Sequence, residues 1–321
     1  MKILEIPGLT LQQVSAADIA RIEAAAGGNA DVVVTPQREA VEHVAEAEVI
    51  FGLVPRSLFL AAPNLRWVHA IASGVDMFLY PEFVASEVLL SSEKGLVGEH
   101  LADHGFGLLL MLTRQLHTAR TLGQDAWNHR PEMRAQEIEL TGRTMGIVGF
   151  GGTGRAFARR AAAFGMSCQA IDRDPVPGSP EVAEVAGRDQ FSQLLQTSDV
   201  VSVCVPLTAE TRDMFDATAF GHMKNDAFLV NVTRGEVMQE LALVAALKDG
   251  QIRGAALDVA PREPLPADSE LWGLPNVVMT PHTAGASQFR AQRNIDRFVN
   301  NLEKLTAGEP LDGLIDKELG Y

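Results

Sequence analysis

A glycine-rich stretch near the middle of the chain constrains the fold more than any other feature. The segment Thr144–Gly154 opens as a short apolar strand and continues with glycines at 149, 151 and 154, after which a helix-forming segment begins. A second apolar strand follows and ends at Asp172. This order of strand, glycine-rich turn, helix, strand and acid is typical of a dinucleotide-binding fold.

Each residue of this motif has a separate role in that interpretation. Gly149 allows a tight turn, Gly151 lets the backbone approach a pyrophosphate, and Gly154 lets the helix pack on the strand. The helix N-terminus then offers free N–H groups and the positive end of its dipole to the phosphates. The carboxylate of Asp172 is placed to accept hydrogen bonds from ribose hydroxyls. The sequence therefore predicts that the chain binds a dinucleotide.

Length and charge narrow the class of protein. A chain of 321 residues suggests two domains, at about 150 residues each. The formal net charge of −14 argues against a nucleic-acid or anionic-membrane partner, because neither attracts an acidic surface. The N-terminus lacks the pattern of a signal peptide, and no apolar run approaches the ~20 residues of a membrane span. We therefore expect a cytoplasmic protein. Cys168 and Cys204 lie in apolar runs and are expected to be buried thiols, not a disulfide or a metal-binding pair.

Strand-like and helix-like segments alternate along most of the chain, which predicts parallel sheets covered by helices on both faces. One long apolar helix, which suits a domain linker or a dimer contact, is expected over Gly98–Leu122, and a shorter helix over Pro36–Ala45. The main expected strands are Lys2–Ile6, Asp31–Val34, Glu48–Phe51, Arg66–Ala70, Glu87–Leu90, Asp199–Val205, Ala227–Val232, Ile252–Val259 and Val277–Met279.

Three polar residues follow strands of the second half, where ligands bind in open parallel sheets. Arg234 follows the strand 227–232, and its guanidinium could bind a carboxylate bidentately, although a surface arginine in a turn is commoner. Glu263 and His282 follow the next two strands. Each alone is more often structural, but a carboxylate on one imidazole nitrogen fixes the tautomer of an acid/base histidine. The three residues form a candidate catalytic group.

Several motifs resemble signatures of the D-isomer-specific 2-hydroxyacid dehydrogenases, in particular of glyoxylate/hydroxypyruvate reductase-like members. The similarity runs from about Leu65 to Ser287. The motifs are Leu65–Asp76, Gly95–His104, Leu140–Gly149, Val205–Thr211, Asn231–Val237, Ala256–Val259, Arg262–Leu265 and Thr280–Gly285.

The resemblance implies an NAD(P)-dependent oxidoreductase that interconverts a small 2-oxo acid and its (R)-2-hydroxy acid by hydride transfer. It implies that His282 is the acid/base, that Glu263 is its carboxylate partner, and that Arg234 anchors the substrate. The expected substrate-binding residues are Ser73, Gly74, Val75 and Leu53, with the N–H groups of Gly74 and Val75 on the substrate carboxylate. The expected cofactor-binding residues are Gly149, Gly151, Gly152, Thr153, Gly154, Asp172, Arg173, Val205, Pro206, Thr211, Val232, Thr233, Arg234, Asp258, His282 and Gly285.

The position of the glycine motif also predicts how the domains are arranged along the chain. We expect an α/β protein with two doubly wound parallel-sheet domains. A Rossmann domain, residues 99–285, is inserted in a flavodoxin-like substrate domain, residues 1–98. The C-terminal helix and tail, residues 286–321, return to the substrate domain.

Cofactor choice and partners are less constrained. Asp172 should repel a 2′-phosphate and favour NAD(H), but the adjacent Arg173 leaves NADP(H) open. A homodimer is expected. The alternative function is an NAD(H)-sensing scaffold, since corepressor-like proteins share this fold. Glyoxylate, hydroxypyruvate, pyruvate and longer 2-oxo acids all remain open as substrates.

Overall fold

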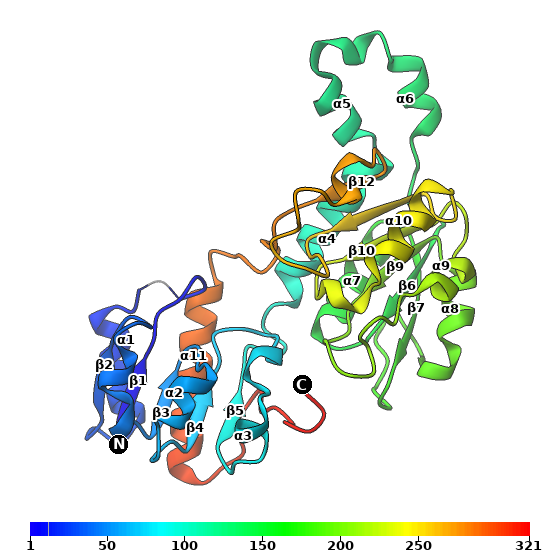
Figure 1. Cartoon of the computed structure of the whole chain (residues 1–321). Coiled ribbons are helices and arrows are strands. Elements are labelled where there is room, and N and C mark those ends of the chain that lie inside the picture. Colours follow the sequence, from blue (N-terminus) through cyan, green and yellow to red (C-terminus); the bar gives the residue numbers. More distant parts are fainter. Residues whose placement is uncertain (12) are drawn as a thin grey trace. The chain divides into compact units, whose positions relative to one another are not determined.

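The structure of the chain is a computed structural model that describes residues 1–11 and 13–321. The chain divides into two compact units, one formed by Met1–Val97 with Ala286–Tyr321 and the other by Gly98–Gly285 (Figure 1). Each unit is built on one sheet whose strands all pair in parallel. The predicted fold class, two parallel-sheet α/β domains, is therefore confirmed. No helix in the described part of the chain is long and apolar enough to cross a membrane.

The first unit has a five-stranded sheet in the order β2-β1-β3-β4-β5. This is the strand order of flavodoxin-like folds, in which ligands bind where the order reverses at the carboxyl edge. The strands are β1 (Lys2–Glu5), β2 (Asp31–Val34), β3 (Val49–Phe51), β4 (Trp67–His69) and β5 (Leu89–Ser91).

Helices cover both faces of this sheet, because successive side chains of its strands point alternately into two apolar clusters. One cluster joins Phe51 and Trp67 to Phe298 of α11 (Arg290–Ala307), which packs beside α1 (Ala16–Ala25). The rings of Phe51 and Phe298 stack with their centroids 4.3 Å apart. The other cluster joins the opposite side chains of the strands to the short helices α2 (Arg56–Leu60) and α3 (Pro81–Val84).

The helix predicted over Pro36–Ala45 is wrong. That segment forms two 3₁₀ turns, Ala40–Glu42 and Val44–Glu46. Ala40 and Val44 are the buried residues of these turns. So small an apolar face is too weak to offset the cost of nucleating an α-helix.

The second unit has a seven-stranded sheet in the order β12-β11-β10-β9-β6-β7-β8. Read from β8, the third, second and first strands of the unit are followed by the fourth, fifth and sixth, which is the Rossmann order. The strands are β6 (Thr144–Val148), β7 (Ser167–Asp172), β8 (Val185–Gly187), β9 (Val200–Val203), β10 (Phe228–Asn231), β11 (Gly254–Leu257) and β12 (Val277–Met279).

Two groups of helices cover this sheet. On one face, α4 (Gly98–Thr113) packs against α7 (Gly152–Ala163) within one apolar cluster. The other face is covered by α8 (Phe191–Thr197), α9 (Ala217–His222) and α10 (Glu240–Lys248).

The single helix predicted over Gly98–Leu122 is also wrong. Helix α4 ends at Thr113, and Gln115 adopts a left-handed backbone with φ of 51°. A separate helix α5 (Leu116–Leu122) follows, then a 3₁₀ turn and α6 (Arg130–Gln136). In Figure 1 this α5–α6 arm projects from the second unit.

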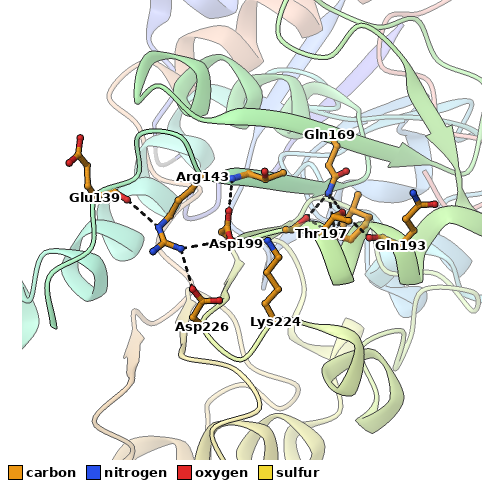
Figure 2. A network of polar contacts seen from close by, with 11 residues as sticks. Glu139, Arg143, Gln169, Gln193, Thr197, Asp199, Lys224 and Asp226 are labelled. Atoms are coloured by element: carbon orange, nitrogen blue, oxygen red, sulfur yellow. Dashed lines mark hydrogen bonds and ion pairs between the residues drawn. The ribbon is translucent and has the colours of Figure 1, made fainter.

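A polar network ties the amino ends of the central strands of the second unit together (Figure 2). Asp199, just before β9, accepts hydrogen bonds from the Thr144 N–H at 2.7 Å and from Lys224 Nζ at 2.9 Å. Burial alone would raise the pKa of Asp199, but these hydrogen bonds outweigh it and hold the pKa below its ordinary value. The network therefore fixes the amino ends of these strands, at the opposite end of the sheet from the glycine turn.

Glu5 is an unusual buried acid at the carboxyl end of β1. It is fully buried, and neither carboxylate oxygen has a hydrogen-bond partner in the described part of the chain. Since side chains alternate along a strand, Glu5 shares the face of Ile3, which belongs to the cluster under α1 and α11. Burial raises the pKa of Glu5 to about 7, and the nearby Asp18 adds to the shift.

This raised pKa makes the stability of the chain depend on pH. The folded state binds more protons than the unfolded state between the ordinary pKa of 4.5 and about 7, so the free energy of unfolding falls as pH rises through that range. We expect Glu5→Gln to remove this dependence. From about pH 5 to about pH 8, the variant should gain up to about 3 kcal/mol relative to wild type. Denaturant unfolding at both pH values measures the gain, with exposed Glu42→Gln as the control; a Glu5→Gln shift that is equal at both pH values would contradict the expectation.

Candidate active site

The glycine turn joins β6 to α7 and leaves its backbone open. Gly149 has a φ of 96°, a region that strongly favours glycine. A Cβ on Gly154 would lie 2.2 Å from the carbonyl oxygen of Gly149, so the helix and the turn are in direct backbone contact. A Cβ on Gly151, in contrast, would meet nothing within 4 Å. Gly152 and Thr153, next to that open backbone, are the first residues of α7, and N–H groups in a first helical turn have no acceptor within the helix. These residues fit a pyrophosphate.

Asp172 ends β7 beside this turn. One carboxylate oxygen accepts a hydrogen bond from the Phe150 N–H at 2.7 Å, and the other accepts one from the Asp174 N–H at 3.1 Å. The guanidinium of Arg173 pairs with the carboxylate of Asp174 through contacts of 2.9 and 3.1 Å. An acid in this position fits a ribose, and the charge of the adjacent arginine is partly balanced by Asp174.

Five further residues predicted to contact the cofactor lie after β9 and β10, namely Val205, Pro206, Thr211, Val232 and Thr233. Thr211 closes the turn after β9, because its hydroxyl donates to the Pro206 carbonyl at 2.6 Å and accepts from the Thr208 N–H at 2.9 Å. Val205 packs against an apolar cluster of the same unit. After β10, Val232 is buried in the core, and the Thr233 hydroxyl donates to the Asn231 side chain at 3.0 Å.

Arg234 is half-buried at the carboxyl end of β10. Its backbone carbonyl accepts a hydrogen bond from the Asn231 side chain at 2.9 Å, and one guanidinium nitrogen donates to the Thr233 carbonyl at 3.0 Å. The next residue must be glycine, because a Cβ on Gly235 would lie 1.9 Å from the carbonyl carbon of Ala260. The sequence therefore fixes the backbone from which this guanidinium extends.

Glu263 and His282 form a hydrogen-bonded pair. The Nδ1 of His282 lies 2.7 Å from one carboxylate oxygen of Glu263, and the other oxygen accepts from the Ala260 N–H at 3.0 Å. A carboxylate accepts only, so Nδ1 carries a proton and Nε2 is left to exchange one with a ligand. Both side chains are accessible, with exposed fractions of 42% for His282 and 38% for Glu263.

The loop that carries His282 is held by Asp258. The carboxylate of Asp258 accepts hydrogen bonds from the N–H groups of Thr283 and Ala284, at 2.9 and 2.8 Å, and from the Thr280 hydroxyl at 2.6 Å. The N–H of His282 donates to the Asp258 backbone carbonyl at 2.7 Å. With its oxygens engaged in this way and only 1% of its surface exposed, Asp258 shapes the loop that ends at Gly285.

Two residues of this network carried no role in the sequence prediction. Nε2 of His104, on α4, lies 2.7 Å from the Thr280 hydroxyl and 3.4 Å from an oxygen of Asp258. Both residues stand in motifs that carry the family resemblance, which was the available signal. The sequence separation of 176 residues between them hides the contact.

The residues predicted to bind substrate lie in the first unit. Ser73, Gly74 and Val75 follow β4, and Leu53 follows β3, so all four are at the carboxyl end of that sheet. The N–H groups of Ser73, Gly74 and Val75 donate to no protein acceptor among residues 1–11 and 13–321. Three free donors on consecutive residues could bind a carboxylate.

Thr280 provides a direct test of the Asp258 network. Thr280→Val keeps the shape of the side chain but removes the hydroxyl between Asp258 and His104. We expect it to lower the free energy of unfolding by about 2 kcal/mol, because a hydrogen bond to a buried charge is lost. Thr283→Val, whose side chain is exposed, should change it by less than about 0.5 kcal/mol. Equal unfolding curves for the two variants would disprove this role of Thr280.

Comparisons with known proteins identify the family. Residues 106–284 match the model of the D-isomer specific 2-hydroxyacid dehydrogenase NAD binding domain. A glyoxylate reductase of Korarchaeum cryptofilum is 36% identical over 87% of this chain and 86% of its own, and a glycerate dehydrogenase of Methylorubrum extorquens is 32% identical over 86% and 88%. The crystal structure of a D-isomer specific 2-hydroxyacid dehydrogenase from Xanthobacter autotrophicus Py2, in complex with NADPH and MES, is 26% identical with a TM-score of 0.82 over 99% of both chains. The chain therefore belongs to the D-isomer specific 2-hydroxyacid dehydrogenase family.

Proposed function

We propose that this chain reduces a small 2-oxo acid to the (R)-2-hydroxy acid with NAD(P)H, and catalyses the reverse oxidation. The observation that carries the proposal is the contact of 2.7 Å between His282 Nδ1 and Glu263, in the unit that contains the glycine turn. The names of the relatives, glyoxylate reductase and glycerate dehydrogenase, support a small acid as substrate. We assign cofactor binding, together with the roles of Arg234 and His282, to the unit Gly98–Gly285, and substrate binding by backbone N–H groups to the other unit.

His282 supplies the proton in this reaction. A nicotinamide bound at the glycine turn would supply a hydride to the carbonyl carbon, and negative charge would then develop on the carbonyl oxygen. Protonated His282 donates from Nε2 to that oxygen, so that one hydride and one proton convert the carbonyl to a hydroxyl. Glu263 holds the ring in the required tautomer and stabilises the imidazolium before transfer.

Arg234, in the second unit, is the proposed anchor for the acid group of the substrate. The guanidinium of Arg234 can hold a carboxylate through two parallel hydrogen bonds and polarise the adjacent carbonyl. In the first unit, the N–H groups of Ser73, Gly74 and Val75 are the proposed donors to a substrate carboxylate. Leu53, an apolar residue at the same sheet end, contacts the substrate side chain and favours a small or apolar one.

We propose NAD(H) as the preferred cofactor. The carboxylate of Asp172 would repel the 2′-phosphate of NADP(H), and its two hydrogen bonds to backbone N–H groups keep it in place. Asp174 pairs with Arg173, the cation that would otherwise offset the repulsion. The Xanthobacter relative was crystallised with NADPH, so both cofactors belong in the test.

Absorbance assays with NADH and NADPH against glyoxylate, hydroxypyruvate, pyruvate and longer 2-oxo acids test the function. We expect turnover with a small acid and a higher kcat/KM with NADH.

His282→Ala should lower kcat by about 10²–10⁴-fold, the usual contribution of a general acid, with NADH affinity unchanged. Arg234→Lys should mainly raise the KM for the oxo acid, because the ammonium cannot bind bidentately. NADH binding without turnover of any acid would favour the dinucleotide-sensing alternative.

We also propose that the chain forms a homodimer through the α5–α6 arm. None of the residues of α5, the following 3₁₀ turn or α6 is buried, and Trp127 and Leu116 are 78% and 53% exposed. Short helices without a packed face are marginal in water, so a second copy would supply the missing contacts. Sedimentation should give a dimer for the wild type and a monomer for Trp127→Glu, whereas Trp272→Glu, at a 57% exposed tryptophan outside the arm, should stay dimeric. A monomeric wild type would disprove the dimer.

A further inference from the structure

A chain of buried polar side chains crosses one end of the sheet in the first unit. Ser91 ends β5, His69 ends β4, Glu93 follows β5, and Asn294 lies in the second turn of α11, the helix along this sheet in Figure 1. All four have exposed fractions of 0%. Arg290, one turn before Asn294, forms an ion pair with Glu93. We call Ser91, His69, Asn294 and Glu93 the buried relay.

The hydrogen bonds of the buried relay have one consistent direction. The Asn294 amide donates to Glu93 at 2.8 Å, so its oxygen is left to accept from His69 Nε2 at 2.9 Å. His69 Nδ1 then accepts from the Ser91 hydroxyl at 2.7 Å, and that hydroxyl accepts from the Trp67 indole at 2.9 Å. With a neutral imidazole, both ring nitrogens of His69 have a hydrogen-bond partner. Burial lowers the pKa of His69 to about 3, so the ring stays neutral at working pH.

Ser91 and Glu93 also hold the start of the loop that follows β4 through backbone hydrogen bonds. His69 directly precedes Ala70, whose N–H donates to the Ser91 carbonyl at 2.8 Å. Two residues on, the Ala72 carbonyl accepts from the Glu93 N–H at 3.2 Å. The donors of Ser73, Gly74 and Val75 come immediately after these two anchors. Their direction is therefore set by where Glu93 and Ser91 are held.

We propose that the buried relay is a positioning device for the N–H groups of Ser73–Val75, with Asn294 and His69 as positioning residues. The role in substrate binding rests on the proposed function; the effect on the loop does not. Replacing buried polar groups with apolar ones of similar volume is often neutral or stabilising, so bulk stability alone does not explain the buried relay. Geometry does, because three backbone donors select a carboxylate only when their directions are fixed.

The chain offers a matched control on the same helix. Asn301 is also fully buried, and its side chain makes two hydrogen bonds, both to the backbone of Asp312, at 2.9 and 2.8 Å. Asn294→Ala and Asn301→Ala therefore remove the same group from the same helix at equal burial. We expect both to lower the melting temperature, but Asn294→Ala alone to raise the KM for the 2-oxo acid, by about tenfold. The NADH dissociation constant should change by less than about twofold in both.

Hydrogen exchange separates this proposal from the proposed function, because it needs no substrate. In Asn294→Ala, but not in Asn301→Ala, the amides of Ala70 and Glu93 should exchange faster by about tenfold or more, as their bonds to Ser91 and Ala72 open. Ser91→Ala, a milder change, should act in the same direction and serves if Asn294→Ala does not fold. Unchanged exchange of both amides, or equal KM values for the two asparagine variants, would overturn the proposal. If the wild type turns over no 2-oxo acid but Asn294→Ala and Asn301→Ala still differ in amide exchange, the proposed function is overturned and the positioning role is kept.

Discussion

The hydrogen-bonded carboxylate of Asp258 is the constraint on which the candidate active site depends. A buried carboxylate is unfavourable by several kcal/mol unless hydrogen bonds replace its hydration. Thr280, Thr283 and Ala284 supply those bonds, which requires the chain to fold back around the carboxylate after β12. His282, inside that reversal, takes a φ of 53°, which costs roughly 1–2 kcal/mol for a non-glycine residue. The satisfied carboxylate offsets this strain, and the strained backbone directs the imidazole to Glu263.

The sequence was most informative where strand ends determine position. Arg234, Glu263 and His282 could be chosen because residues after parallel strands gather at one edge of a sheet, and the fold class followed from the alternation of elements. The sequence was least informative where contacts between distant segments decide. The break at Gln115 and the link from His104 to Thr280 depend on packing and hydrogen bonds that no local pattern records.

The effect of Asp172 on cofactor choice depends on the residues next to it. From the sequence, Arg173 opposes the effect of Asp172. In the structure, Arg173 is paired with Asp174, and Asp172 is bound to the N–H of Phe150 in the glycine turn. The carboxylate thus contributes to the shape of the turn as well as to its charge. Residues 172–174 are linked by these contacts, so a change in the Asp174 side chain, which pairs with Arg173, alters the electrostatic field at Asp172.

The groups that we propose for binding are placed in different ways by the two sheets. In the second unit, the groups are side chains such as Arg234 and His282, each of which can be aimed by its own neighbours. In the first unit, the groups are backbone N–H donors of Ser73–Val75, which have no side-chain torsions to adjust. Their direction can be set only by fixing the adjacent chain, as Ser91 and Glu93 do at Ala70 and Ala72, just before Ser73. A backbone site therefore requires rigid surroundings. This requirement accounts for the burial of Glu93 and His69, two polar residues that are unfavourable to bury.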